Sequence, residues 1–251
     1  MPTPKIHNAY DSLIELLNHM LDTQATLSEF DKARLKRDAS RLNKPNSYAC
    51  LAAINSFIGD VSETLQMAEA ALKYRDLSIV DNVFHALYNL RLYGDICTYA
   101  IDEPWVLQHP KVLVAVYQSA LHSINLEVCD MTREHLIDHD DSLSILFKKH
   151  DIIKNFLSSS NSQHVLREYI TYALQFFHSE INTNNNCVIE FEEMHDEGIK
   201  FLAVDITLTN TNMDQAIDLE STWHKYISNF NANVEIKSLI SFQIEGDSFN
   251  D

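Results

Sequence analysis

Residues 46–76 read NSYACLAAINSFIGDVSETLQMAEAALKYRD, and this stretch decides how the fold is interpreted. In its first half, apolar residues recur at the three- and four-residue spacing of one helix face, and Asn46 is a candidate helix cap. Gly59-Asp60 interrupts the pattern, and a second apolar stripe follows over 61–72. Two amphipathic helices around a glycine turn predict a helical hairpin, which cannot bury its apolar face alone and must stack on neighbours.

The hairpin pattern recurs on both sides of this stretch. Asp60, Asp95 and Asp130 stand at equal steps of 35, two of them after glycine, and each is predicted to open a helix. Pro104 is expected to end one helix and Pro110 to begin the next, because proline is tolerated only in the first turn of a helix. Hairpins are predicted over 6–42, with Ser28 as a cap, over 46–76 and over 79–102, and further helices over 112–126, 131–139, 143–156 and 165–181.

The pattern changes after the polar stretch 182–186. Strands are predicted over 188–192, 201–207 and 234–244, with a turn at Glu197-Gly198 and a helix over 213–230. The chain is therefore predicted to be mainly α, with an α-helical repeat domain over 1–181 and a small α+β domain of ββαβ order over 182–251. Three strands and one helix leave a face and two edges uncovered. We expect this sheet either to pack on the last helices or to pair with a second copy in a homodimer.

Composition narrows the classes of partner. The chain has 251 residues and a formal net charge of −17, from 36 acidic and 19 basic residues. That charge repels phosphate backbones, so we expect no direct nucleic-acid binding and favour a partner with a basic surface. The basic residues of 32–44 point around a helix and predict a solvated face. The longest apolar run, near 112–116, is too short to cross a membrane. The polar start and four separated cysteines lead us to expect a soluble, cytoplasmic protein.

Residues 46–140 resemble tetratricopeptide repeats. The first unit matches at Leu51, Ala52, Gly59-Asp60, Ala68, Ala71 and Leu72. The second matches at Ala86, Leu87, Gly94-Asp95 and Leu107, and departs from the family pattern at Glu103 and Pro104. The third matches at Leu121 and Asp130, with Cys129 in place of glycine. The resemblance implies a right-handed solenoid whose first helices line a concave groove that holds a peptide or a partner helix.

The resemblance also implies which residues contact a partner. Capture of a free carboxylate is not expected, because Arg91 is the only Lys or Arg after the first turn of the groove helices. Their polar and aromatic side chains are read either as groove contacts or as the solvated faces of amphipathic helices. The candidate partner-binding residues are Tyr48, Asn55, Asn82, His85, Tyr88, Asn89, Tyr117, Gln118, His122 and Asn125.

Residues that could carry chemistry match no known catalytic motif. His135 and His139 have the four-residue spacing of a metal pair on a helix, and the alternative is an acidic helix end with two exposed histidines. No Walker, GxGxxG or GxSxG motif occurs in the sequence. We therefore expect no catalytic residue, cofactor or metal. An enzyme in the C-terminal domain would need a pocket joining Glu190, Asp205, His224 or His195.

These observations predict a noncatalytic scaffold or regulator that binds a protein or peptide through the groove of the helical repeats. The alternative is an acidic inhibitor or immunity-type protein that neutralises a basic, nucleic-acid-processing enzyme, because a charge of −17 would steer it onto a phosphate-binding cleft.

Overall fold

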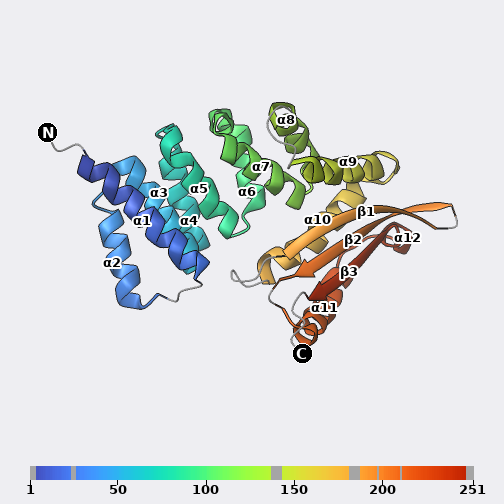
Figure 1. The fold of residues 1–251 in the computed structure, drawn as a ribbon. Helices are drawn as coiled ribbons and strands as arrows, with labels where there is room; N and C mark the ends of the chain where they lie inside the picture. Colours follow the sequence, from blue (N-terminus) through green and yellow to red (C-terminus); the bar gives the residue numbers. More distant parts are fainter. Residues whose placement is uncertain are drawn as a thin grey trace. The chain divides into compact units, whose positions relative to one another are not determined.

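The computed structural model is mainly helical, with a small C-terminal sheet, as the sequence predicts (Figure 1). Its contacts divide the chain into two compact units, Met1–Ser119 and Ala120–Asp251. Twelve α-helices, one 3-10 helix and one three-stranded sheet lie within the described part of the chain. The structure describes residues 4–23, 27–136, 143–180, 187–196, 198–209 and 211–246.

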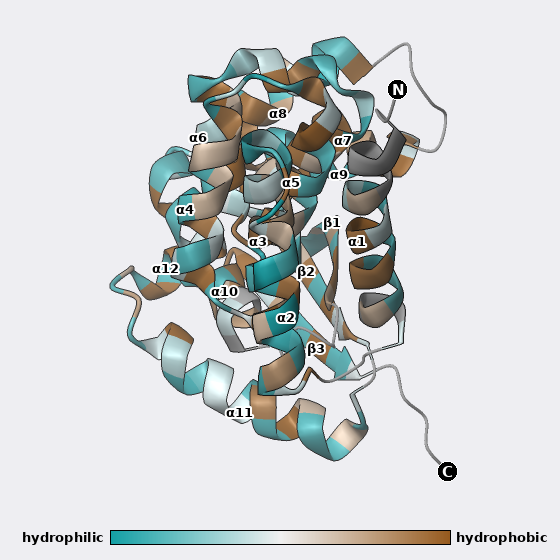
Figure 2. Ribbon diagram, turned by 90° about the vertical axis from the view of Figure 1, so that its left-hand side faces the viewer, coloured by the Kyte–Doolittle hydropathy of each residue, from teal (hydrophilic) through white to brown (hydrophobic). Residues whose placement is uncertain are grey.

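Unit 1 is built from helices packed in a recurring order. The pair α1 and α2 contacts α3, and the pair α3 and α4 contacts α5 in the same way. Each of these two pairs of helices therefore packs on the first helix of the next pair. The most hydrophilic helix is α2, where only Leu35 and Ala39 are buried (Figure 2). The helices that begin in unit 1 are α1 (Pro4–Asp22), α2 (Glu29–Ala39), α3 (Lys44–Ile58), α4 (Val61–Leu72), α5 (Leu77–Asn89), α6 (Tyr93–Asp102), the 3-10 helix η1 (Pro104–Gln108) and α7 (Pro110–His122).

Several predicted helix boundaries are confirmed by their local contacts. The Ser28 hydroxyl accepts a hydrogen bond from the Asp31 N–H at 3.1 Å and caps α2. Gly59 ends α3 in the left-handed region, at φ +83°, where a glycine has no Cβ to clash. The Asp60 carboxylate then caps α4 by accepting from the Glu63 N–H. The two prolines also act as predicted, since η1 begins at Pro104 and α7 at Pro110.

Other predicted boundaries are wrong. Asn46 lies inside α3, which begins at Lys44. Gly94 lies in the first turn of α6, and the break before it is made by Arg91, which adopts φ +55° without being a glycine. Asp130 lies inside α8 (Leu126–Leu136). The even spacing of the three aspartates therefore does not mark three helix starts.

Unit 2 combines helices with the sheet. Strands β1 and β2 form an antiparallel hairpin, and β3 pairs with β2 in parallel after the crossover through α11. Gly198, at φ +84°, lies at the hairpin turn as predicted, and its expected partner Glu197 lies outside the described residues. Besides α8, the elements are α9 (Ser144–Ser158), α10 (Gln163–Glu180), β1 (Cys187–Asp196), β2 (Ile199–Leu208), α11 (Met213–Ser228), α12 (Val234–Lys237) and β3 (Ile240–Gly246).

One face of the sheet is packed and the other is exposed. On the packed face, the Phe242 ring lies 5.9 Å from Tyr169 of α10 and 5.0 Å from Trp223 of α11. Helix α9 contacts β1 and β2.

Helices α8 to α10 belong to unit 2, although their sequence pattern predicts them as part of the helical domain. The predicted domain boundary at 181/182 falls outside the described residues.

The last strand begins later than predicted. Residues 234–237 form α12, which is capped by the Asn233 side chain accepting from the Glu235 N–H at 3.1 Å. Strand β3 starts only at Ile240. Unit 2 therefore has a second, short helix between β2 and β3, and the expected ββαβ order does not include it.

Candidate functional site

The predicted partner-binding residues are divided between the two units. Two of them, His122 and Asn125, lie in Ala120–Asp251. Tyr48, Asn55, Asn82, His85, Tyr88, Asn89, Tyr117 and Gln118 lie in Met1–Ser119.

Several of these side chains have roles inside the fold. Asn55 is only 2% exposed and Tyr117 is fully buried, so neither offers a surface contact. The Asn82 amide donates to the Tyr10 hydroxyl at 2.6 Å, which links α5 to α1. The Asn125 side chain accepts from the Val128 N–H at 3.3 Å, at the start of α8. The buried positions show why a polar residue on a helix cannot be assigned to a groove from spacing alone.

The remaining candidates stay partly or fully accessible. His85 is exposed on α5. The Tyr48 ring lies 6.1 Å from Tyr74, and the Tyr88 ring packs edge-on against Tyr93 at 5.3 Å. Asn89, Gln118 and His122 are half-buried.

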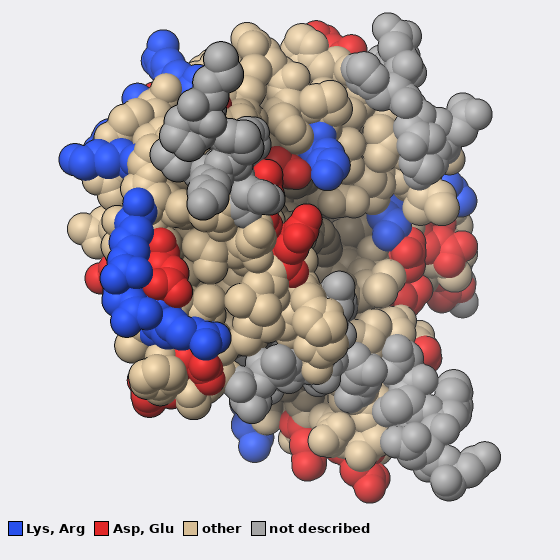
Figure 3. All heavy atoms as spheres, turned by 60° about the vertical axis from the view of Figure 1, so that its left-hand side comes forward, with Lys and Arg blue, Asp and Glu red and all other residues tan. Residues whose placement is uncertain are grey.

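The basic residues of α2 form ion pairs along their own helix. Lys32 Nζ lies 2.6 Å from Glu29 Oε1, and Arg34 lies 3.6 Å from Asp31. Figure 3 shows Lys and Arg side chains gathered along one edge of the molecule, with Asp and Glu side chains directly beside them. This pairing within one helix is what a solvated helix face would show, because carboxylates of α2 lie beside Lys32, Arg34 and Arg37.

The negative charge is concentrated in unit 2. Residues 120–251 contain 22 acidic and 8 basic residues, a net charge of −14, whereas residues 1–119 contain 14 acidic and 11 basic residues, a net charge of −3. The acidic character of the chain is thus a property of the unit that carries the sheet.

Part of this charge lies on the exposed face of the sheet. Glu190 of β1 and Asp205 of β2 are direct cross-strand partners, and Gln243 of β3 stands opposite Asp205 on the other side. The pKa of Asp205 is raised, first by partial burial and then by the nearby charges of Glu192, Glu245 and Glu190. Like charges placed directly opposite each other on a sheet are destabilising. This group of four carboxylates, Glu190, Glu192, Asp205 and Glu245, is called the acidic sheet face below.

A lysine of helix α9 binds the outer edge of β1. Lys149 of α9 is 14% exposed, and its Nζ donates to the Ile189 carbonyl at 2.9 Å and lies 2.7 Å from Glu190 Oε1. The same ammonium group therefore occupies an edge carbonyl and neutralises one member of the acidic sheet face. In the described part of the chain, no ion pair is made by Glu192, Asp205 or Glu245.

The four residues of the enzymatic interpretation do not converge. Glu190 and Asp205 are neighbours, but strand alternation places His195 on the opposite face, where its Nε2 lies 3.3 Å from Glu193 Oε1. His224 lies on α11, 3.7 Å from Glu220.

The predicted histidine pair is described only in part. His135 is exposed in the last turn of α8, and His139 lies outside the described residues. Among the residues that the structure describes, no three His, Cys, Asp or Glu side chains are placed to hold a metal ion.

A buried histidine lies within an ion-pair cluster between α8 and α9. His150 is fully buried, and its Nε2 lies 3.5 Å from Asp130 Oδ1, which also receives Lys154 at 2.6 Å. Burial is the main cause that lowers the pKa of His150. Arg133 pairs with Asp151 through both of its terminal nitrogens, and this hydrogen bonding lowers the pKa of the Asp151 carboxyl. The cluster holds the two helices together.

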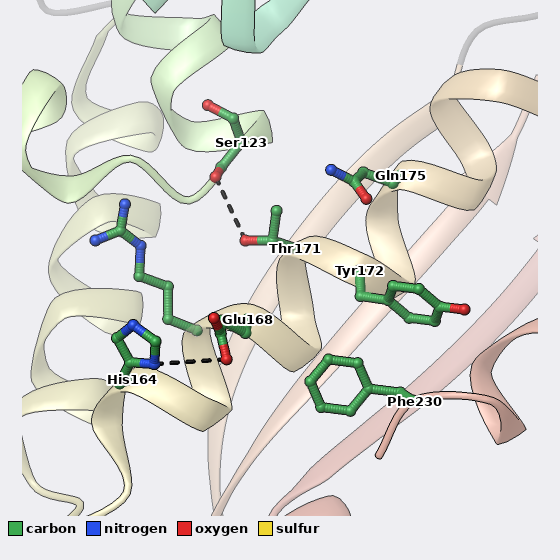
Figure 4. A pocket seen from close by; sticks show the side chains of 8 residues that line it. Ser123, His164, Glu168, Thr171, Tyr172, Gln175 and Phe230 are labelled. Atoms are coloured by element: carbon green, nitrogen blue, oxygen red, sulfur yellow. Dashed lines mark hydrogen bonds and ion pairs between the residues drawn. The ribbon is translucent and has the colours of Figure 1, made fainter. Parts of the chain in front are cut away.

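A cleft of about 590 Å³ runs along one stripe of α10 (Figure 4). Thr171 donates to the Ser123 carbonyl at 3.5 Å, and Tyr172 stacks on Tyr226 at 4.3 Å between ring centres. Arg167 forms no ion pair with any described residue. This cleft is not predicted from the sequence, although its α10 residues recur at helical spacing. The lining residues are Ser123, His164, Arg167, Glu168, Thr171, Tyr172, Gln175 and Phe230.

No described helix is long and apolar enough to cross a membrane. Comparison with known proteins finds no family model, no curated protein and no solved structure that matches this chain.

Proposed function

We propose that this protein is a noncatalytic interaction scaffold or regulator that binds a partner protein with a basic surface. The observation that carries this proposal is the acidic sheet face of unit 2, where Glu192, Asp205 and Glu245 crowd together on an uncovered face without ion pairs to described residues. A cationic partner would relieve the repulsion among these carboxylates on binding. A net charge of −14 in this unit would also accelerate the encounter with such a partner.

For unit 1 we propose a tetratricopeptide-like solenoid that adds a second contact surface. Support comes from the recurring contacts of helix pairs, in which α1 and α2 pack on α3 as α3 and α4 pack on α5. In this proposal the first helix of each pair faces a groove, and accessible side chains such as His85 and Gln118 contact the partner.

The same charge distribution favours a second candidate, an acidic inhibitor that occupies the phosphate-binding cleft of a basic enzyme. A scaffold and such an inhibitor differ in what binding does to the partner. An inhibitor in the phosphate-binding cleft would abolish the activity of the enzyme, whereas a scaffold would leave its partner active.

The test is capture of partners by the tagged full chain at low and high salt, with identification of the retained protein. A charge-removing variant, Glu192→Gln with Asp205→Asn and Glu245→Gln, is compared with Glu127→Gln, Glu134→Gln and Asp218→Asn, which remove the same charge elsewhere in unit 2. We expect a basic partner that is lost at high salt and lost in the first variant but kept in the second.

A groove variant separates the two units. His85→Ala with Gln118→Ala changes only unit 1. A partner that stays bound at high salt and to the charge-removing variant, but is lost in the groove variant, would overturn the role of unit 2. Binding would then be assigned to the helices of unit 1.

A further inference from the structure

The two outer edges of the sheet differ in what covers them. The β1 edge is occupied at Ile189 by the Lys149 ammonium of α9. Strand β3 is the other edge of the order β1-β2-β3, and among the described residues no strand pairs with its outer side. An uncovered edge strand presents N–H and C=O groups that can bind another extended chain.

The hydrogen-bond pattern of β3 shows which of its N–H and C=O groups point outward. The Leu202 N–H donates to the Leu239 carbonyl at 2.9 Å, and Ala203 is the register partner of Ser241. In a parallel ladder, alternate residues point their main-chain groups toward the neighbouring strand. The main chains of Ser241, Gln243 and Glu245 therefore face β2. Those of Phe242 and Ile244 point outward and bond no described residue.

The side chains beside this edge have two distinct chemistries. On the exposed face, Gln243 and Glu245 adjoin Asp205 of β2. On the packed face, Phe242 and Ile244 remain partly exposed, whereas their β2 partners Val204 and Ile206 are fully buried. A strand added to β3 would thus have the Gln243 amide and the Glu245 carboxylate along one side, with Asp205 one strand further in, and partly open apolar side chains along the other.

The usable length of this edge is limited at its end. A Cβ on Gly246 would clash with the Thr211 carbonyl oxygen, so this position lies directly against the loop before α11. The open part of the edge is therefore the stretch from Ile240 to Glu245.

We propose that the edge of β3 binds an extended segment of the basic partner, with basic and apolar side chains alternating along that segment. Main-chain hydrogen bonds to Phe242 and Ile244 would supply affinity, and the alternation would supply specificity. The basic side chains would lie beside Glu245 at the β3 side of the acidic sheet face, with Asp205 one strand further in, and the apolar ones beside Phe242 and Ile244. This inference rests on the proposed function and names the partner's segment.

Charge selects this occupant over a second copy of the chain. Pairing β3 with β3 of another molecule would bring together two units that each carry a net charge of −14. It would also extend the acidic sheet face with further carboxylates, whereas a lysine-bearing strand neutralises it.

The probe is a synthetic peptide, blocked at both ends, that alternates lysine and valine over the length of β3. Its control has the same composition with all lysines in one half and all valines in the other. We expect the alternating peptide to bind the full chain and to slow amide exchange at Phe242 and Ile244. Exchange at Gln243, already bonded toward β2, should not change. The block peptide should bind more weakly and protect neither amide.

Two pairs of variants test the contacts separately. Ile244→Pro removes an outward N–H and should weaken peptide binding about tenfold, whereas Ile244→Ala keeps that donor and should weaken it less. Glu245→Gln should weaken binding about two- to fivefold at low salt and little at high salt. Glu134→Gln, on α8, should leave binding unchanged.

Protection of Phe242 and Ile244 that depends on protein concentration without peptide would show a second copy on the edge and overturn the proposal. Failure of the alternating peptide to protect these amides would also overturn it. If the chain still retains its partner in a salt-dependent way, the proposed function survives that failure. If neither the protection of these amides nor the salt-dependent retention of a partner is observed, both proposals are overturned.

Discussion

Units 1 and 2 differ in how their main-chain N–H and C=O groups are hydrogen-bonded and in how much negative charge they carry. In unit 1 the described residues form helices, which complete most hydrogen bonds within each segment, and the net charge is only −3. Unit 2 contains a sheet, which must end in two edges, and carries −14. Helices can close their own surface, whereas a sheet leaves groups that another element or partner must cover. This difference is why the proposed binding surface lies in unit 2.

The tryptophans allow the two units to be followed separately. The chain has two, Trp105 in unit 1 and Trp223 in unit 2. Replacing Trp223 with Phe leaves fluorescence from unit 1, and replacing Trp105 with Phe leaves fluorescence from unit 2.

The largest effect is expected from opening the apolar core of unit 1. Leu87 of α5 is fully buried, so Leu87→Ala should lower the free energy of unfolding by about 2–5 kcal/mol through lost apolar burial and the cavity left behind. Urea unfolding followed by Trp105 fluorescence measures this loss. Leu77→Ala, at a position on the same helix that is 38% exposed, should cost much less. Equal losses would show that α5 is not held by its buried face.

A smaller effect is expected when the covered sheet edge is opened. Lys149→Met keeps the apolar stem but removes the hydrogen bond to the Ile189 carbonyl and the pair with Glu190. We expect a loss of about 1–3 kcal/mol in urea unfolding followed by Trp223 fluorescence. Lys148→Met is the matched control, since Lys148 is exposed and makes no ion pair with the described residues. A control that costs as much as Lys149→Met would contradict the edge contact.

The buried histidine predicts how stability depends on pH. Because the pKa of His150 is lowered from its ordinary value of 6.5 in the folded state, the unfolded chain binds a proton more readily. The free energy of unfolding should therefore fall as pH drops below about 6.5, until the folded pKa is reached. Unfolding by urea at a series of pH values checks this slope.

His150→Gln should flatten the pH dependence, whereas His164→Gln, at an exposed position of α10, should leave it as in the wild type. An unchanged slope in the His150 variant would assign the pH response to another group.

The smallest effect is expected on the acidic sheet face. Asp205→Asn removes one member of a crowded group and should raise the free energy of unfolding by about 0.2–1 kcal/mol at neutral pH and low salt. Added salt should reduce the gain. The pKa of Asp205 is raised above 3.8 in the folded state, so the gain should also vanish as pH falls through that folded pKa.

Asp218→Asn, on exposed α11, is the control for a general loss of charge. A gain as large in this variant would show that the net charge of unit 2 matters and that the position of Asp205 does not.

Local signals in the sequence predicted much of the fold because their physical cause is local. The caps at Ser28 and Asp60 and the left-handed turn at Gly59 depend on a few neighbouring residues. The turn at Arg91 is not predicted, since a non-glycine residue rarely adopts the left-handed region; there the Leu92 N–H donates to the Leu87 carbonyl and closes the end of α5.

The candidate site was predicted less well than the fold. Glu190 and Asp205 are predicted only as members of a pocket that an enzyme would need, together with His224 or His195. Lys149, Glu192 and Glu245 are not predicted to join them, because they reach the same face from α9, β1 and β3. Burial likewise removed Asn55 from the predicted groove, and no helical spacing shows which polar residue points inward.

The sequence by itself determined the helical class, the hairpin around Gly59-Asp60, the change from helical to alternating pattern, and the excess of acidic residues. Each of these follows from spacing or composition within a short segment. Only the tertiary structure decided that α9 and α10 accompany the sheet, that β3 runs parallel to β2, and that Lys149 binds one edge while no described strand pairs with the other. Strand pairing joins residues far apart in sequence, so neither the pairing nor the surface it leaves uncovered is encoded in any one segment.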